Sequence, residues 1–469
     1  MSEAIVVGSG PNGLAAAIEL ARSGHTVRVI EGEDSLGGGL RSAALTLPGF
    51  VHDVCASVHP LTLASPFFRS LQLGVEWIHG APLAHPLDDG RAVVLERTVR
   101  ATARHLGHDG PAYWRLFAPL VRDADTLVPH LLGPMRPTRH PLLLAGFALY
   151  ALRSANRLIT AKFKHERARA LLAGIAAHSM LPLEQPPSAG FMLTLGILAH
   201  AVGWPVVRGG SQRLADALVE HARGLGIGFA VEERVASAKQ VDDARVALLS
   251  ITPRQLLGID GLSLEPGYRR ALERFRYGPG VFKLDYALDA PVPWTARECW
   301  LAATVHLGGT FEQIAASESA VARGEAPERP FVVVVQPTLF DRTRAPAGKH
   351  VLWAYCHVPN GSDVDMTKRI EAQIERFAPG FGDRILARHT MNAREMQTHD
   401  ASFVGGDING GLANLRQFFA RPVVSFDPYR VPRTKLLLCS ASTPPGGGVH
   451  GMCGYFAARS ALRLLAVGD

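Results

Sequence analysis

The sequence predicts a two-domain α/β protein, with one domain built on a parallel sheet and the other on a mixed sheet. Two observations predict it: a strand–helix–strand unit at the N-terminus, and two later segments with the same kind of buried strand and a helix close by. A chain of 469 residues is long enough for two such domains with substantial cores. The composition, 47% hydrophobic and 19% charged, is that of a globular protein.

The N-terminal unit carries a glycine motif between its first strand and its first helix. The apolar strand AIVV over residues 4–7 is followed by GSGPNG, which places glycines at Gly8, Gly10 and Gly13. Gly8 permits a tight turn, Gly10 leaves the backbone open to a diphosphate, and Gly13 lets the helix pack closely on the strand. An amphipathic helix then continues to Gly24. This order predicts a Rossmann-like dinucleotide-binding domain.

The start of the helix and the end of the second strand supply the polar contacts of that domain. The helix begins at Pro11 and Asn12, where backbone N–H groups and the positive end of the helix dipole favour a diphosphate. The second strand, TVRVIE, ends at Glu31. A carboxylate at this place accepts hydrogen bonds from ribose hydroxyls. An ordinary glycine turn would leave Glu31 without a role.

The residues after Glu31 favour FAD over NAD as the dinucleotide. They read GEDSLGGGLRS and include Gly37, Gly38 and Arg41. A glycine cluster followed by an arginine is the second half of the FAD signature in flavoproteins of the glutathione-reductase type. The glycines let the chain pass close to the diphosphate, and the guanidinium offsets its charge. The alternative is a flexible surface loop.

Composition and cysteine spacing argue against several other classes of protein. No C-x-x-C or other close cysteine pair is present, which argues against a zinc site, a disulfide scaffold and a disulfide reductase. A net charge of +7 is modest, and no basic run with interleaved aromatics indicates nucleic acid binding. We predict no metal site. No secretory signal is visible and no apolar run is long enough to span a bilayer, so we expect a cytoplasmic protein.

Two later segments return to the kind of structure that the N-terminus predicts. The first has a Gly-Gly turn and an amphipathic helix around residues 209–222, then a buried strand that ends at Pro253. The second has a buried strand from Lys435, the loop TPPGGGVHG, and a helix over residues 452–465. Three consecutive glycines before a helix predict a close backbone approach to a ligand. A simple closing helix is the alternative.

Together these segments resemble the phytoene desaturase-like branch of the FAD-dependent amine oxidase superfamily. The resemblance is carried by GSGPNGLAAAIELARSGHTVRVIE and LGGGLRS, by VVRGGSQRLADAL, by APAG, and by LLLCSASTPPGGGVHGMCGYFAARSAL. It runs along the whole chain and is close to the subgroup named after pyridine nucleotide-disulphide oxidoreductase domain-containing protein 2. It implies a discontinuous FAD-binding domain at 1–75, 205–258 and 430–469. The two inserts, 76–204 and 259–429, would form the substrate domain.

The resemblance also implies further cofactor contacts. The backbone of Val235 would lie on the adenine side. The loop and helix start at Gly448, Val449 and Met452 would lie against the flavin, with the helix N-terminus near its N1/O2 edge.

Lys283 and His450 are the candidates for a catalytic role. Alternation on a strand places Val281, Lys283 and Asp285 on one face. In amine oxidases a lysine at a similar place holds a water beside flavin N5; the alternative here is a solvent-exposed lysine at a strand edge. His450 stands next to the presumed flavin contacts and could move a proton. It could equally cap the loop.

The favoured function is FAD-dependent oxidoreduction of an apolar, isoprenoid-like small molecule, with hydride transfer to flavin N5. An amine oxidase is the first alternative, although Val449 stands where those enzymes often place an aromatic ring. A non-catalytic FAD-binding scaffold is the second. No second dinucleotide motif has a flanking strand and helix, so oxygen or a quinone is the expected electron acceptor. Trp353, Tyr355 and His357 alternate on a strand and line either a substrate cavity or an ordinary core.

The segment at 129–169 is a candidate for peripheral membrane contact. It contains an uncharged apolar stretch at 142–152 with arginines and lysines on both sides. An apolar stretch with basic flanks is typical of a helix that lies on the inner face of an anionic membrane. The alternative is a buried helix of the substrate domain.

Overall fold

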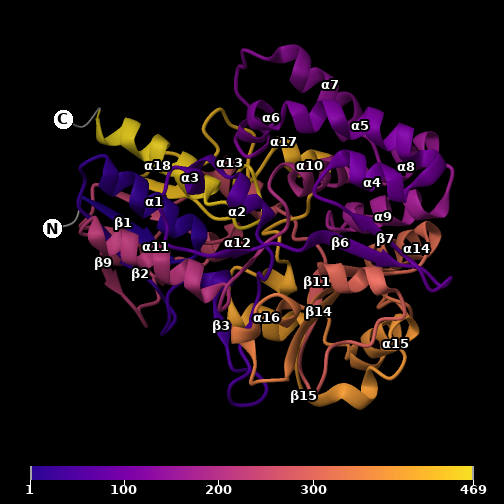
Figure 1. The fold of residues 1–469 in the computed structure, drawn as a ribbon. Helices are drawn as coiled ribbons and strands as arrows, with labels where there is room; N and C mark the ends of the chain where they lie inside the picture. Colours follow the sequence, from indigo (N-terminus) through magenta and orange to yellow (C-terminus); the bar gives the residue numbers. More distant parts are fainter. Residues whose placement is uncertain (1–2, 467–469) are drawn as a thin grey trace.

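The computed structural model describes residues 3–466 and contains two large sheets (Figure 1). The first sheet is parallel throughout and has the strand order β16-β10-β1-β2-β9. Its strands are β1 (Ala4–Val7), β2 (Val27–Ile30), β9 (Gly228–Ala230), β10 (Val246–Leu249) and β16 (Leu436–Leu438). They come from all three segments that the sequence assigns to the FAD-binding domain. The predicted α/β fold with a Rossmann-like domain is confirmed.

The first and last helices of the chain pack against each other beside this sheet. They are α1 (Pro11–Arg22) and α18 (Met452–Leu465), and they lie side by side at the end of the molecule that holds both termini (Figure 1). Their backbones approach so closely that a Cβ added to Gly454 would lie 1.7 Å from the carbonyl oxygen of Asn12. Only glycine fits there, so the end of the chain completes the N-terminal unit.

The second sheet is mixed and has the order β15-β11-β14-β13-β12-β6-β7, in which only β12 and β6 run parallel. Its strands are β6 (Ala81–Pro86), β7 (Ala92–Leu95), β11 (Gly280–Leu288), β12 (Ala302–Leu307), β13 (Val332–Val335), β14 (His350–Val358) and β15 (Ile385–Met391). All nine residues of β11 pair with β14. All of these strands lie within the two predicted inserts; the exact domain limits stay predictions.

Helices cover both faces of the second sheet. One face packs against α15 (Thr367–Phe377) through an apolar cluster that includes Phe282, Leu284 and Ile370. The other face looks toward a helical layer (Figure 1). That layer contains α4 (Val99–His105), α5 (Gly110–Arg122), α6 (Ala124–Leu131), α7 (Pro141–Ala151), α8 (Ala155–Lys162), α9 (Glu166–Ala177) and α10 (Ser188–Ala201).

The remaining helices and short strands connect these layers. The helices are α2 (Pro60–Ala64), α3 (Pro66–Arg69), α11 (Gln212–Gly224), α12 (Pro253–Leu257), α13 (Pro266–Glu273), α14 (Phe311–Ala322), α16 (Ala393–His399) and α17 (Leu415–Phe419). The strands β3 (Ser42–Ala43) and β4 (His52–Asp53) pair with each other, as do β5 (Trp77–Ile78) and β8 (Val206–Val207).

A buried ion pair joins the cofactor domain to the second insert. Arg344 lies 3.0 Å from the carboxylate of Asp53, and both side chains are 1% exposed. Asp53 also accepts hydrogen bonds from the hydroxyls of Ser42 and Ser57 and from the backbone N–H of Ser211. Burial acts to raise the pKa of Asp53, but Arg344 and these donors hold it below its ordinary value. Loss of either partner would leave a buried charge unpaired.

Within residues 3–466 we find no individual helix with the length and hydropathy for a transmembrane span; α7 and α8 satisfy both only as a pair, and the chain bends by 92° between them.

Candidate active site

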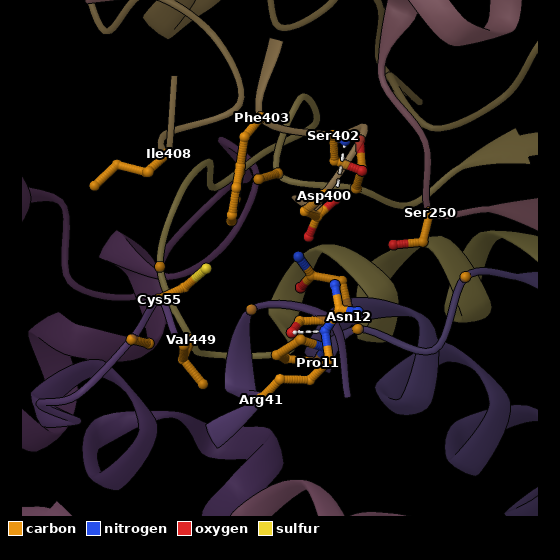
Figure 2. Close-up of a pocket in the computed structure, with 18 of the residues that line it drawn as sticks. Pro11, Asn12, Arg41, Cys55, Ser250, Asp400, Ser402, Phe403, Ile408 and Val449 are labelled. Carbon is orange, nitrogen blue, oxygen red and sulfur yellow. Dashed lines mark hydrogen bonds between the residues drawn. The ribbon is translucent and has the colours of Figure 1, made fainter. Parts of the chain in front are cut away.

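One long cavity of about 690 Å³ runs between the two sheets. At one end it is lined by Glu31 and Val235, and at the other by Thr304 and Tyr355. Figure 2 shows that side chains from distant segments meet around it, with Pro11 and Asn12 on one side and Asp400 and Phe403 on the other. The cavity therefore spans both predicted domains.

The glycines of the first turn have the geometry of a diphosphate cradle. Gly8 has φ +94°, which glycine adopts easily. A Cβ on Gly13 would lie 1.9 Å from the carbonyl oxygen of Gly8, so helix and strand could not pack with a larger residue there. A Cβ on Gly10, by contrast, would meet only Gly38 Cα, 4.0 Å away. Gly10 lines the cavity, and its missing side chain leaves room for a ligand.

Two polar side chains beside the cradle match the needs of a dinucleotide. Glu31 accepts hydrogen bonds from the backbone N–H and hydroxyl of Ser9, at 2.7 and 2.6 Å, and from the N–H of Glu33. These donors fix its carboxylate at the cavity wall. Asn12 Oδ1 is buried and has no protein partner among the described residues. The N-terminus of α1 has no side-chain cap either. The site therefore fits an adenine dinucleotide such as FAD.

The second glycine cluster folds under the same cavity. Gly37 and Gly38 have φ values of +119° and +54°, and Gly38 lines the cavity. Arg41 donates from Nε to the carbonyl oxygen of Gly38 and from Nη2 to that of His399, both at 3.0 Å. This fixes the guanidinium at the cavity wall (Figure 2). Gly37 does not line the cavity. A Cβ added to Gly37 would lie only 2.7 Å from the Cβ of Ala215, so this glycine allows close packing against α11.

The C-terminal loop reaches the cavity through Gly448 and Val449. Thr62 donates to the carbonyl oxygen of Val449 at 2.7 Å, and Ser65 to that of His450 at 2.6 Å. These bonds hold the loop against α2 and α3. Gly448 has φ +119°.

Of the two roles considered for His450, proton transfer and loop capping, its hydrogen bonds match loop capping. Its Nδ1 accepts from the backbone N–H of Met452 at 3.0 Å, so its Nε2 donates to the carbonyl oxygen of Gly446 at 3.1 Å. Burial lowers the pKa of His450 to about 4, which keeps the ring neutral. Neither His450 nor Met452 lines the cavity, and the Met452 N–H is already bonded. Both therefore support the loop rather than face a ligand.

Lys283 is buried at the cavity wall rather than exposed at a strand edge. It is 2% exposed, its Nζ bonds Asp285, and it lies 5.7 Å from the centre of the Trp353 ring. His52 and His389 approach Asp285 at 3.7 and 3.9 Å. Burial raises the pKa of Asp285 to about 6, although Lys283 opposes the shift. The structure thus excludes a solvated lysine and brings a buried charge pair to the site.

Beyond the C-terminal loop the cavity forms a compartment between the second sheet and the helical layer. Its walls are His178, Leu195, Trp204, Val281, Thr304, Val333, Val335, Trp353 and Tyr355. We call this the substrate compartment. Two of the three alternating residues of β14, Trp353 and Tyr355, line it, whereas His357 bonds Glu318 behind it.

The segment around residues 400–409 carries cavity residues that the sequence did not indicate. Asp400, Ser402, Phe403 and Ile408 all lie at the wall (Figure 2). Burial raises the pKa of Asp400 above its ordinary value. No motif in this segment marks these residues as cavity residues. The segment is also far from the glycine cradle in sequence, so the sequence alone did not place it beside the cofactor. Asn409 also lines the cavity.

Comparisons with known proteins agree with this geometry. A model of an NAD(P)-binding Rossmann-like domain matches residues 6–71. Pyridine nucleotide-disulfide oxidoreductase domain-containing protein 2 of Rattus norvegicus is 26% identical over 99% of this chain and 94% of its own. The phytoene dehydrogenase of Streptomyces griseus is 24% identical over 95% of this chain and 92% of its own. A solved triple mutant of putrescine oxidase shares the fold, with TM-score 0.64 and 16% identity over 99% of both chains.

The cradle, the position of Glu31 and the full-length similarity to these proteins lead to one conclusion: the chain is an FAD-dependent oxidoreductase that is similar along its length to phytoene dehydrogenase and has the fold of putrescine oxidase.

Proposed function

We propose that this oxidoreductase removes hydride from a C–H bond of an apolar, isoprenoid-like substrate. The observation that carries the proposal is that the cofactor cavity continues into a compartment with largely apolar and aromatic walls. FAD, when bound, supplies a two-electron acceptor at its N5. The residues of the chain position it through Gly8, Gly10, Asn12, Glu31 and Arg41, and the compartment excludes water from the reacting bond.

Lys283 is the side chain best placed for a direct part in the reaction. Its ammonium group lines the cavity and is held by Asp285 and by the Trp353 ring. In that position its Nζ can orient a water or substrate oxygen at the reacting end. His450 acts on the loop instead, because both ring nitrogens are bonded to backbone.

An amine substrate is the runner-up and fits the compartment less well. A protonated amine needs a carboxylate or an aromatic cage, and Val449 rather than an aromatic ring stands at the C-terminal loop.

Reduction of the bound flavin distinguishes an enzyme from a scaffold. We expect anaerobic holoenzyme to bleach near the flavin maximum when phytoene or a shorter isoprenoid is added, and to reoxidise with oxygen or a soluble quinone. NADH and NADPH should leave the flavin oxidised. If no isoprenoid or amine in a broad panel bleaches it, the scaffold alternative stands instead.

We also propose that an anionic membrane surface is the partner of the segment at 129–169. On α7, Leu142 is 87% exposed and Leu149 is 59% exposed. Arg153 and Lys162 flank the neighbouring Tyr150 ring, within 5.7 and 4.9 Å of its centre. Exposed leucines beside cations are typical of an interfacial helix.

A second exposed apolar group lies near this segment. Arg136 stacks on Phe456 of α18, and Asp427 bonds Ser460 one turn further along the same helix. Met135 and Phe426 are the residues next to Arg136 and Asp427 in sequence. Both are largely exposed, as are Phe418, Phe419 and Val424. Met135 belongs to the segment at 129–169 and adds a third exposed apolar side chain to it.

Vesicle cosedimentation tests the membrane proposal. Holoenzyme should sediment with phosphatidylglycerol vesicles and much less with phosphatidylcholine. Leu142→Ser with Leu149→Ser should lower binding by about tenfold or more, since each buried leucine contributes about 1.5–3 kcal/mol. Leu386→Ser, on the exposed side of β15, is the control. Equal recovery with and without vesicles would contradict the proposal.

A further inference from the structure

The two faces of the second sheet differ in polarity in a way that an apolar substrate does not explain. On the face toward α15, Phe282, Leu284, Val305 and Leu352 form a continuous apolar cluster. The face toward the compartment carries polar groups on three strands. These are Lys283 on β11, Thr304 and His306 on β12, and Trp353, Tyr355 and His357 on β14. Strands that only enclosed a hydrocarbon would not need them.

Two of these polar groups face the compartment without a protein partner among residues 3–466. Thr304 Oγ1 is buried, and the side chain is 2% exposed. Trp353 Nε1 is likewise unpartnered. Both side chains line the cavity. A buried hydroxyl or N–H left unpaired costs about 1–3 kcal/mol. A substrate oxygen at this wall would accept hydrogen bonds from these two donors and so remove the free-energy cost. A bound hydrocarbon would leave both donors unpaired.

A pair of neutral histidines lies beside Thr304. His306 follows Thr304 by two residues on the same face of β12, so the two are about 7 Å apart. His306 Nε2 lies 3.0 Å from His178 Nε2, and His178 lines the compartment. At that distance one ring donates and the other accepts, so the two are not both charged. Burial lowers the pKa of His178 to about 3 and holds the pKa of His306 well below its ordinary value. Neutral donors and acceptors suit a neutral oxygen better than an ion.

The rest of the compartment is apolar. Leu195, Val281, Val333 and Val335 supply aliphatic side chains to it, and the Trp204 ring lies beside the histidine pair. We propose that the substrate is amphipathic, with an isoprenoid-like body against these residues and a hydroxyl or carbonyl oxygen bonded at Thr304, Trp353 and His178. This rests on the proposed function and specifies its substrate class.

Ligand binding to the holoenzyme tests the proposal with a matched pair of probes. The probes are geranylgeraniol and the same hydrocarbon without its hydroxyl, and binding is read from the shift in flavin absorbance. We expect the alcohol to bind about tenfold more tightly. Thr304→Val should weaken alcohol binding about three- to tenfold, the effect of one neutral hydrogen bond, and leave hydrocarbon binding unchanged or tighter. Thr304→Ser should retain alcohol binding.

The chain offers a matched control and a second variant. Thr367 on α15 is also buried with an unpartnered hydroxyl, but it lies outside the cavity. Thr367→Val should therefore leave both affinities unchanged. Trp353→Phe keeps an aromatic ring and removes only the indole donor, so it tests the same wall if Thr304→Val does not fold.

The outcomes separate this inference from the proposed function. Equal or tighter binding of the hydrocarbon, or equal weakening of both probes by Thr304→Val, would overturn the amphipathic substrate. If in addition the hydrocarbon bleaches the flavin, the proposed function is retained and only the amphipathic substrate is rejected. If neither probe binds and no isoprenoid bleaches the flavin, both fail.

Discussion

The two ends of the cavity are built by different means. The cofactor end is made of backbone: glycines that no other residue could replace, an uncapped helix start and one fixed acid, all within a short stretch of sequence. The substrate end is made of side chains from β11, β12, β13, β14 and α10 and from the residue after α9, which are far apart in the chain. A backbone site constrains the sequence locally and is therefore recognisable, whereas a side-chain wall depends on packing between strands.

The largest expected effect comes from a substitution that disrupts the cofactor end of the cavity and leaves the substrate end unchanged. Gly13→Ala places a Cβ 1.9 Å from the Gly8 carbonyl oxygen. We expect colourless protein with unfolding free energy lowered by roughly 3 kcal/mol or more. Gly146→Ala on α7, where a Cβ meets nothing within 4 Å, is the control and should be yellow and at least as stable. Yellow Gly13→Ala protein of normal stability would show that the cradle is not closely packed.

The ribose acid gives a smaller effect at the same end. Glu31→Ala should weaken FAD binding by about 1.5–3 kcal/mol, because it removes charge-assisted hydrogen bonds. Titration of apoprotein with FAD measures this, and the exposed Glu220→Ala on α11 is the control. An unchanged dissociation constant would mean that the carboxylate serves only Ser9 and Glu33.

Lys283→Met sharpens the comparison from the substrate end. We expect FAD to stay bound while flavin reduction or reoxidation slows about tenfold or more, since a buried group at the reacting end is lost. Lys435→Met, at the strand of the other sheet where Lys435 bonds the carbonyl oxygen of Ala244, should not change either rate. Stopped-flow absorbance separates the half-reactions. Wild-type rates in both half-reactions would show that Lys283 has only a structural role.

The smallest expected effect is a change in FAD affinity caused by Asp400→Asn, at the part of the wall that faces the glycine cradle. Asp400 reaches toward Gly38 across the cradle, and burial raises its pKa. At low pH the carboxyl is neutral; as pH rises it ionises and repels the diphosphate. Asp400→Asn should therefore bind FAD about two- to tenfold more tightly at pH 8, with the difference shrinking toward pH 4. A pH-independent ratio would remove Asp400 from the diphosphate environment.

These differences explain what the sequence could and could not predict. The parallel sheet and the glycine cradle follow from a local pattern and are present, and Glu31 and Arg41 lie at the cavity wall. The buried position of Lys283 depends on β14 and β15 covering both sides of β11, which no local pattern states. Likewise the hydrogen bond from the Met452 N–H to His450 requires the loop conformation, and the approach of Asp400 to Gly38 joins residues hundreds of positions apart.

The close packing of α18 on α1 has a consequence for the synthesis of the protein. Gly454 fits against Asn12, yet the ribosome makes Asn12 near the start of the chain and Gly454 near its end. At about 5–20 residues per second, on the order of 20–90 s pass between them. During that interval the nascent N-terminal helix exposes the apolar surface that α18 will cover. FAD retention should therefore be acquired only after α18 has been synthesised, and a truncation that removes α18 should abolish it.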